Sequence, residues 1–152
     1  MKLQQISWNN QNGWDTANFL PDVNLVLVFA DSDFFYKDEC YQALASFYPK
    51  SDIVGCSTAG NIRDTKISSD NLTALAIRFE KSWIQSVKVD LDTSSNHESE
   101  MQRALKNFPK EQLKHCFVLS DGLDINATYL AQSLSLELEN FSITGGLAGD
   151  SD

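Results

Sequence analysis

Small polar and nucleophilic side chains lie between two glycines near residue 55 of this sequence. Residues 55–60 read Gly-Cys-Ser-Thr-Ala-Gly, and they follow the short apolar pair Ile53-Val54. A loop of this kind can hold a catalytic nucleophile, cradle a phosphate group, or line a small-molecule pocket that catalyses nothing. The rest of the sequence has to distinguish among these three kinds of chemistry.

A nucleophile in this loop needs a base that accepts its proton. Gly55-Cys56-Ser57-Thr58-Ala59 approximates the G-x-S-x-G elbow of serine hydrolases, in which an acid and then a histidine follow the serine. Asp121 could be the acid, but His97 lies in the first turn of an expected helix and His115 at the start of an expected strand. Neither histidine is placed to reach the serine. An enzyme that uses Cys56 as a thiolate stays open as an alternative.

The glycines do not match the known loops that bind nucleotide phosphates. Gly55 and Gly60 have the spacing of a P-loop, but Asn61-Ile62 stands where Lys-Ser/Thr is required. A second glycine-rich segment, Gly145-Gly146-Leu147-Ala148-Gly149-Asp150, lacks the spacing of a dinucleotide fingerprint. The two histidines have no partners at ligand spacing, so we predict no metal site. Glycine-rich turns can still present backbone N–H groups to a carboxylate.

Apolar strands and amphipathic helices alternate along the chain and must position these loops. Continuous apolar runs predict buried strands over residues 25–29, 53–54, 116–119 and 141–144. Helical spacing predicts a helix whose inner face carries Tyr36, Cys40, Ala43/Leu44 and Phe47. A second helix is predicted from the capping box at 95–98 to Pro109, with a buried face of Met101, Ala104, Leu105 and Phe108. A third is predicted over 127–138, with Ala127, Leu130/Ala131, Leu134 and Leu138 on one face. Residues 71–79 and 82–91 alternate like an antiparallel hairpin.

This order of elements predicts an α/β fold in a single domain over residues 1–152. We expect a mixed, mostly parallel sheet with flanking helices and one antiparallel hairpin, and we find no internal repeat in the sequence. Parallel strands end at one edge, so the loops after them should converge on one rim, where α/β proteins bind ligands. The predicted ligand site comprises Gly55, Cys56, Ser57, Thr58, Gly60, Asp121, Gly122, Gly145, Gly146 and Asp150.

Charge and composition exclude several classes of partner. The net charge is −9, from 12 Lys+Arg against 21 Asp+Glu, so we expect no nucleic acid and no anionic membrane surface. Three widely spaced cysteines argue against a disulfide framework and favour a reducing compartment. The N-terminus carries no apolar segment of signal-peptide length, and we predict a cytoplasmic protein.

Three segments, taken in order, resemble the N-terminal half of the FIST domain. They are Gly55–Gly60, Ser120-Asp121-Gly122-Leu123 and Gly145–Asp150, preceded by the strand at 25–29. The resemblance covers roughly residues 20–152 and implies a sensory input domain, known from bacteria and eukaryotes, that binds small ligands such as amino acids. It also implies two partners, a C-terminal FIST half and a signalling output such as a histidine kinase, a chemoreceptor or a cyclic-di-GMP enzyme. That C-terminal half is absent from the 152 residues, so we expect an N-terminal piece of a longer protein.

Residue chemistry and resemblance together predict binding without turnover and without a cofactor. The loop Gly55–Gly60 would offer backbone N–H groups and the Ser57 and Thr58 hydroxyls to a ligand carboxylate. Asp121 or Asp150 would accept from an ammonium group, although Asp121 could equally cap a turn. Two further alternatives stay open. Some family members are reported as haem-dependent nitric oxide sensors, which makes haem an alternative ligand, and an unpaired sheet edge could instead dock a partner domain.

Overall fold

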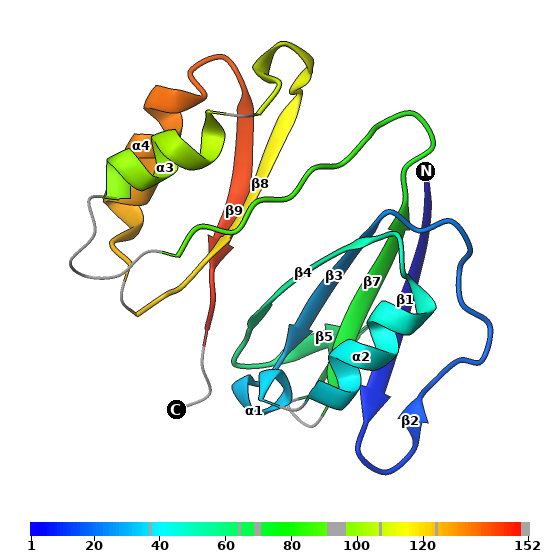
Figure 1. Cartoon of the computed structure of the whole chain (residues 1–152). Coiled ribbons are helices and arrows are strands. Elements are labelled where there is room, and N and C mark those ends of the chain that lie inside the picture. Colours follow the sequence, from blue (N-terminus) through cyan, green and yellow to red (C-terminus); the bar gives the residue numbers. More distant parts are fainter. Residues whose placement is uncertain are drawn as a thin grey trace. The chain divides into compact units, whose positions relative to one another are not determined.

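The computed structural model of the chain describes residues 1–36, 38–63, 65–68, 71–90, 97–106, 108–123 and 125–149. These residues form two compact units (Figure 1). The first unit consists of Met1–Ser86 and the residues from Gly149 onward, and the second consists of Val87–Ala148. Both units combine strands and helices, as the sequence predicts for an α/β fold. Within the described ranges, every helix is too short or too polar to cross a bilayer.

The first unit is built on a five-stranded sheet in the order β2-β1-β7-β3-β4. Its strands are β1 (Lys2–Asn9), β2 (Gly13–Trp14), β3 (Leu25–Ala30), β4 (Asp52–Ser57) and β7 (Leu72–Arg78). Only β3 and β4 run parallel, whereas the pairs β1–β2, β1–β7 and β3–β7 are antiparallel. A separate hairpin is formed by β5 (Asn61–Arg63) and β6 (Lys66–Ser68). The prediction of a mostly parallel sheet is therefore wrong.

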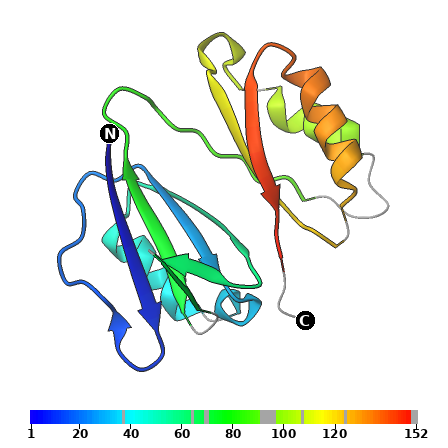
Figure 2. The ribbon, with the colours of Figure 1, turned by 180° about the vertical axis from the view of Figure 1, so that it is seen from behind.

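One face of this sheet is covered by helix α2 (Asp38–Phe47), as Figures 1 and 2 show from opposite sides. Val26, Val28 and Ala30 of β3 face the helix and are fully or almost fully buried, while the residues between them are half-buried. Cys40 and Leu44 of α2 are buried against them, as predicted. The short helix α1 (Ser32–Phe35) precedes α2 and buries Phe34.

The predicted first helix ends at Phe47 as expected, but it begins at Asp38 and not at Tyr36, and its end residues are more exposed than predicted. Tyr36, expected on the buried face, is 85% exposed. Phe47 is also partly exposed, and its ring stacks on Phe19 with centroids 3.9 Å apart. The buried position at this end belongs instead to Tyr48, just beyond the helix. The spacing of apolar residues predicts which residues are buried in the middle of a helix. Burial of the residues at its ends depends on loops that approach from elsewhere in the chain.

The predicted hairpin over 71–91 is wrong. Its first half is a strand, but β7 lies in the middle of the sheet between β1 and β3. Its second half forms no strand over 82–90, the part of it that the structure describes. β7 is buried on both faces over most of its length, and long-range pairing with β1 supplies the neighbour that the hairpin was expected to provide.

The second unit holds two parallel strands under two helices. The strands are β8 (His115–Ser120) and β9 (Ser142–Leu147), and the helices are α3 (His97–Leu105) and α4 (Ala127–Glu137), with a 3₁₀ turn at Lys110–Gln112. The predicted buried positions are confirmed for Met101, Leu105, Leu130, Leu134 and Leu138, which form one core. They are wrong for Ala127 and Ala131, which are exposed because they lie at the margin of the helix face that covers the strands. Asn126 caps α4 by accepting from the N–H groups of Thr128 and Tyr129, at 3.0 and 3.3 Å. Residues 95 and 96 of the predicted capping box lie outside the described residues.

The two units repeat one β-α-β arrangement at an offset of 90 residues. β3 and β4 begin at 25 and 52, and β8 and β9 begin at 115 and 142. In the two parallel pairs Val28 lies opposite Gly55 and Val118 opposite Gly145. The buried residues that follow the same offset are Cys40, Leu44 and Tyr48 in the first unit and Leu130, Leu134 and Leu138 in the second.

The repeat is hidden in the sequence because few residues are shared. Over residues 25–57 and 115–147, six of 33 positions are identical. These are Val28/Val118, Asp31/Asp121, Gln42/Gln132, Leu44/Leu134, Ile53/Ile143 and Gly55/Gly145. The structure thus corrects our expectation that the chain contains no repeat.

Candidate functional site

The loop Gly55–Gly60 covers the carboxyl end of β4, next to the end of β3. Thr58 N–H donates to the Ala30 carbonyl at 2.9 Å and so extends the parallel pairing beyond the strand. The Thr58 hydroxyl donates to the Gly60 carbonyl at 3.1 Å and closes the loop on itself. Gly149, which belongs to the first unit, donates its N–H to the Ser57 carbonyl at 3.0 Å. Four backbone or hydroxyl groups of the loop are therefore held by the fold.

Several donors of this loop are left for a ligand, since the N–H groups of Gly55 and Ser57 point to the edge of β4 that is open among the described residues. The Ser57 hydroxyl on its half-buried side chain and the N–H of exposed Ala59 have no hydrogen-bond partner within the described part of the chain. Both are neutral donors at the carboxyl end of a parallel strand pair. Donors in such a place suit an anionic acceptor such as a carboxylate.

The equivalent loops of the second unit follow β8 and β9. Ala148 N–H donates to the Ser120 carbonyl at 2.7 Å, the counterpart of the bond from Thr58 to Ala30. Asp121 accepts from the N–H of Leu123 at 2.7 Å, just as Asp31 accepts from Asp33 at 3.1 Å in the first unit. Both aspartates thus stabilise a turn after a strand.

The structure gathers the predicted site residues into two groups. Gly55, Cys56, Ser57, Thr58 and Gly60 lie together in the first unit, and Asp121, Gly122, Gly145 and Gly146 lie together in the second. β8 and β9 form their own sheet, so the expected edge of a single sheet is replaced by the edges of two. Asp150 lies outside the described residues, and the assignment of ligand contacts stays a prediction.

Three of the predicted ligand glycines are required by backbone packing. A Cβ at Gly55 would lie less than 3.0 Å from the Val28 carbonyl oxygen, and one at Gly145 would clash in the same way with Val118. A Cβ at Gly122 would clash with the carbonyl of Ala148. Gly146, in contrast, has open space around it. Close approach of neighbouring backbone is therefore sufficient to require glycine at the first three positions, and their contact with a ligand stays a prediction.

Cys56 is not activated as a nucleophile. Its side chain is half-buried, and desolvation raises the pKa of the thiol above its usual value, so that the neutral form dominates at pH 7. The sequence of the first unit, residues 1–86, contains no histidine, and its loop offers no lysine or arginine beside the thiol. The same desolvation raises the pKa of Cys116 in the second unit.

We expect Cys56 to react slowly with iodoacetamide at pH 7. A raised pKa lowers the fraction of thiolate, which is the reacting species, and partial burial limits access. Peptide mass mapping should show slower alkylation of Cys56 in the native chain than in the same chain unfolded in urea, which is the matched control. Faster alkylation in the native chain would favour the thiolate enzyme.

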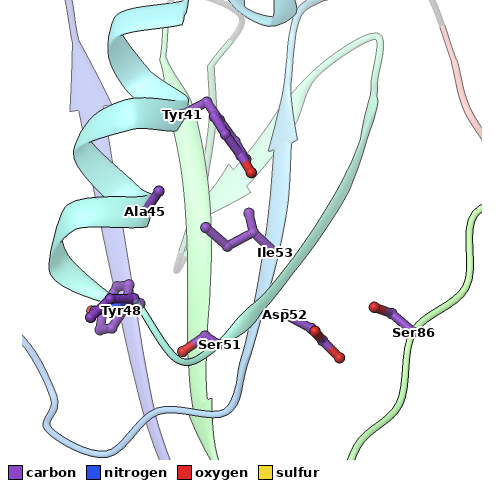
Figure 3. A pocket seen from close by; sticks show the side chains of 8 residues that line it. Tyr41, Ala45, Tyr48, Ser51, Asp52, Ile53 and Ser86 are labelled. Carbon is purple, nitrogen blue, oxygen red and sulfur yellow. The ribbon is translucent and has the colours of Figure 1, made fainter.

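A cavity of about 330 Å³ lies elsewhere in the first unit, at the amino end of β4 (Figure 3). The residues around it include Tyr41, Tyr48, Ser51, Asp52, Ile53 and Ser86. The Ser86 hydroxyl points toward Asp52, and Tyr41 reaches across from α2 (Figure 3). Sequence analysis missed this cavity, although Tyr41 and Tyr48 share a helical face and precede Asp52 closely.

The described residues offer no metal centre. They contain no group of three or more His, Cys, Asp or Glu side chains placed to hold an ion. His115 Nε2 lies 2.8 Å from the Thr144 hydroxyl and is engaged in that hydrogen bond. His115 as found therefore does not fit the axial ligand that haem requires.

Glycine-rich loops follow the paired parallel strands of both units of this α/β chain, and no histidine occurs in the sequence of the unit that carries Cys56. The chain belongs to the FIST family, since the FIST N domain matches residues 24–152 and so spans both units. This domain is a sensory domain predicted in signalling proteins; it is typically non-catalytic and is usually found with a C-terminal FIST half. No curated protein and no solved structure matches the chain.

Proposed function

We propose that this FIST N domain is the small-molecule-binding input domain of a signal-transduction protein. Its ligand is an amino acid or a similar small carboxylate, bound at the loop Gly55–Gly60. The observation that carries this proposal is a pair of donors without partners among the described residues, the Ser57 hydroxyl and the Ala59 N–H. The N–H and hydroxyl of Thr58 and the carbonyls of Ser57 and Gly60 hold the loop in place beside these two donors.

Hydrogen bonds from neutral donors to a charged acceptor are among the stronger ones in proteins. Each such bond contributes about 1.5–3 kcal/mol, and the exposed loop requires little desolvation. No positive side chain lies within residues 55–60, so a second anchor is needed for tight binding. We therefore propose a ligand with moderate affinity, which suits a sensor that must release it.

The ligand leaves the site chemically unchanged. Ser57 has no histidine in its unit to accept its proton, and the Cys56 thiol is neutral at pH 7. We propose that binding is read out by the C-terminal FIST half and a signalling output domain in the longer protein. A haem sensor is less well supported, because His115 is already bonded to Thr144.

The test starts with a thermal-shift screen of amino acids and small carboxylates, followed by calorimetric titration of the best ligand. Ser57→Ala should lower the affinity about five- to a hundred-fold, which corresponds to the loss of about 1–3 kcal/mol. Thr58→Ala should lower it as well, but this substitution also removes the bond that closes the loop onto Gly60. Ser57→Ala is therefore the sharper variant.

Asp52→Asn is the matched control, because it changes a polar residue of the same unit at the cavity described above. Affinity should be unchanged in this variant. Loss of binding in Asp52→Asn with full binding in Ser57→Ala would place the ligand in the cavity and contradict the loop. Mass spectrometry of the ligand after incubation should recover it intact, and a converted ligand would contradict binding without turnover.

A further inference from the structure

One edge of β8 is unpaired in the part of the chain that the structure describes. Ser120 accepts a hydrogen bond from Ala148, so its backbone polar groups face β9. These groups point to alternate sides along a strand, and those of His115, Phe117 and Leu119 therefore point to the other edge. No described residue pairs with them there.

In the first unit, the strand edge that corresponds to the free edge of β8 is occupied by another strand. β3 is the counterpart of β8 at the 90-residue offset, and its outer edge is paired with β7 in antiparallel register. Leu27, the counterpart of Phe117, lies opposite Leu75. The Ile77 carbonyl accepts from Asn24 N–H at 3.0 Å, which shows that Thr73, Leu75 and Ile77 direct their backbone groups toward β3.

The side chains of β7 suit a strand that lies under a helix. Ala74 and Ala76, on the side covered by α2, are fully buried. Leu75 lies on the opposite side, between Leu27 of β3 and Gln5 of β1. Phe117, the counterpart of Leu27 in the second unit, has no strand residue opposite it on this side among the described residues, and its side chain is 45% exposed. The second unit thus has the core, the helix and the parallel pair of the first, but its described residues include no strand equivalent to β7.

We propose that the second unit accepts one additional strand, antiparallel to β8, from the C-terminal FIST half that usually accompanies this domain. Strand addition to an open sheet edge is an established mode of recognition. The repeat specifies the chemistry of the incoming strand. Small side chains such as alanine face α4, and large aliphatic side chains alternate with them beside Phe117. This interaction does not depend on the ligand of the first unit.

The probe is a fluorescein-labelled peptide with the sequence of residues 71–79, NLTALAIRF, flanked by lysines for solubility. Added to the complete 152-residue chain, it should give saturable fluorescence anisotropy. A peptide N-methylated at the position of Leu75 loses an N–H that would face β8, and it should bind at least about tenfold more weakly. A peptide N-methylated at the position of Ala74 keeps every N–H that faces β8 and should bind within about threefold of the unmodified peptide.

The protein side of the test compares two substitutions at one position. Phe117→Pro removes the N–H at the free edge without removing a bond to β9, because the backbone of Phe117 faces away from β9, and proline is accepted on strand edges. It should abolish peptide binding, whereas Phe117→Ala, which keeps the N–H, should retain most of it. Hydrogen exchange should show that the peptide protects the amides of Phe117 and Leu119 but changes Val118 little.

Three results of the peptide experiments would overturn the proposal, and a fourth would come from self-association of the chain. The first three are the absence of binding by the unmodified peptide, equal binding of the two N-methylated peptides, and unchanged binding to Phe117→Pro. Association of the 152-residue chain with itself that Phe117→Pro abolishes would assign the edge to a second copy and would also overturn it. The peptide comparison stands even where Phe117→Pro fails to fold.

Discussion

Replacing Gly145 by alanine should destabilise the chain by about 3 kcal/mol or more. Gly145 has φ +156°, a region of backbone conformation that side chains rarely adopt. An alanine Cβ at this position would also meet the backbone of Val118 on the neighbouring strand, with the carbonyl oxygen nearest. Both effects oppose the substitution, because β9 must either change its conformation or move away from β8.

Gly146→Ala is the control for this prediction. Gly146 is the next residue of the same strand, and a Cβ there would meet nothing within 4 Å. Its substitution should leave stability within about 0.5 kcal/mol of wild type, because surface substitutions away from special backbone geometry cost little. Urea unfolding followed by far-UV circular dichroism measures both variants. Equal midpoints for the two would contradict the close approach of β8 and β9.

Leu44→Ala and Leu134→Ala should each cost about 2–5 kcal/mol. The two residues are counterparts in the repeat, and they are only 1% and 4% exposed. Each lies on the helix that covers its parallel strand pair, so truncation leaves a cavity between helix and sheet. Because each leucine occupies the same position between helix and parallel strands, we expect both losses to fall in this range, although the neighbouring side chains differ in type.

Leu136→Ala provides the matched control, since it is the same substitution on α4 at a residue that is 74% exposed. It should shift stability by no more than about 0.5 kcal/mol. All three tryptophans, Trp8, Trp14 and Trp83, lie in the first unit, so fluorescence follows that unit while circular dichroism follows both. A loss below about 1 kcal/mol at Leu44 or Leu134 would show that the helix is not packed as described.

Local patterns in the sequence predicted the elements of the βαβ arrangements well. Continuous apolar runs located β3, β8 and β9, and helical periodicity placed Leu130, Leu134 and Leu138 on the buried face of α4. The burial expected from these patterns is found for β3 but is wrong for β8 and β9: no residue of either strand is buried, and β9 is exposed at five of its six positions. The FIST resemblance is confirmed over residues 24–152.

Strand direction and long-range pairing could not be predicted in the same way. An apolar strand in the middle of a sheet has the same composition whether its neighbours are parallel or antiparallel, so the sequence did not reveal that β7 separates β1 from β3. β1 alternates only weakly, with Ile6 as its fully buried residue, and gave no clear strand pattern. Residues 82–90 alternate as a strand does, but pairing requires a partner, and none is among the described residues.

The residue types in the sequence located the candidate loops. They did not show which residues contact a ligand and which are required by packing. Glycines at 55, 122 and 145 suggested ligand contact, whereas the structure shows that neighbouring backbone excludes a side chain at each of them. That distinction depends on distances across strands that lie far apart in sequence. The role of Asp121 in a turn was one of two expectations for that residue, and its bond to Leu123 accounts for it. Ligand contacts by the remaining site residues stay a prediction.

Because the two units correspond at an offset of 90 residues, their sequences can be compared position by position within one chain. Tandem duplication of a gene segment produces two units with the same spacing, and afterwards each copy changes at the positions where selection permits. Most of the 33 corresponding positions differ, while the glycine opposite a valine, the inward leucine and the aspartate after the first strand are kept in both copies. These shared positions are where related genes should vary least. The loop 55–60 and its counterpart 145–150 share only their first glycine, so the Ser57 and Thr58 hydroxyls occur in the first copy alone.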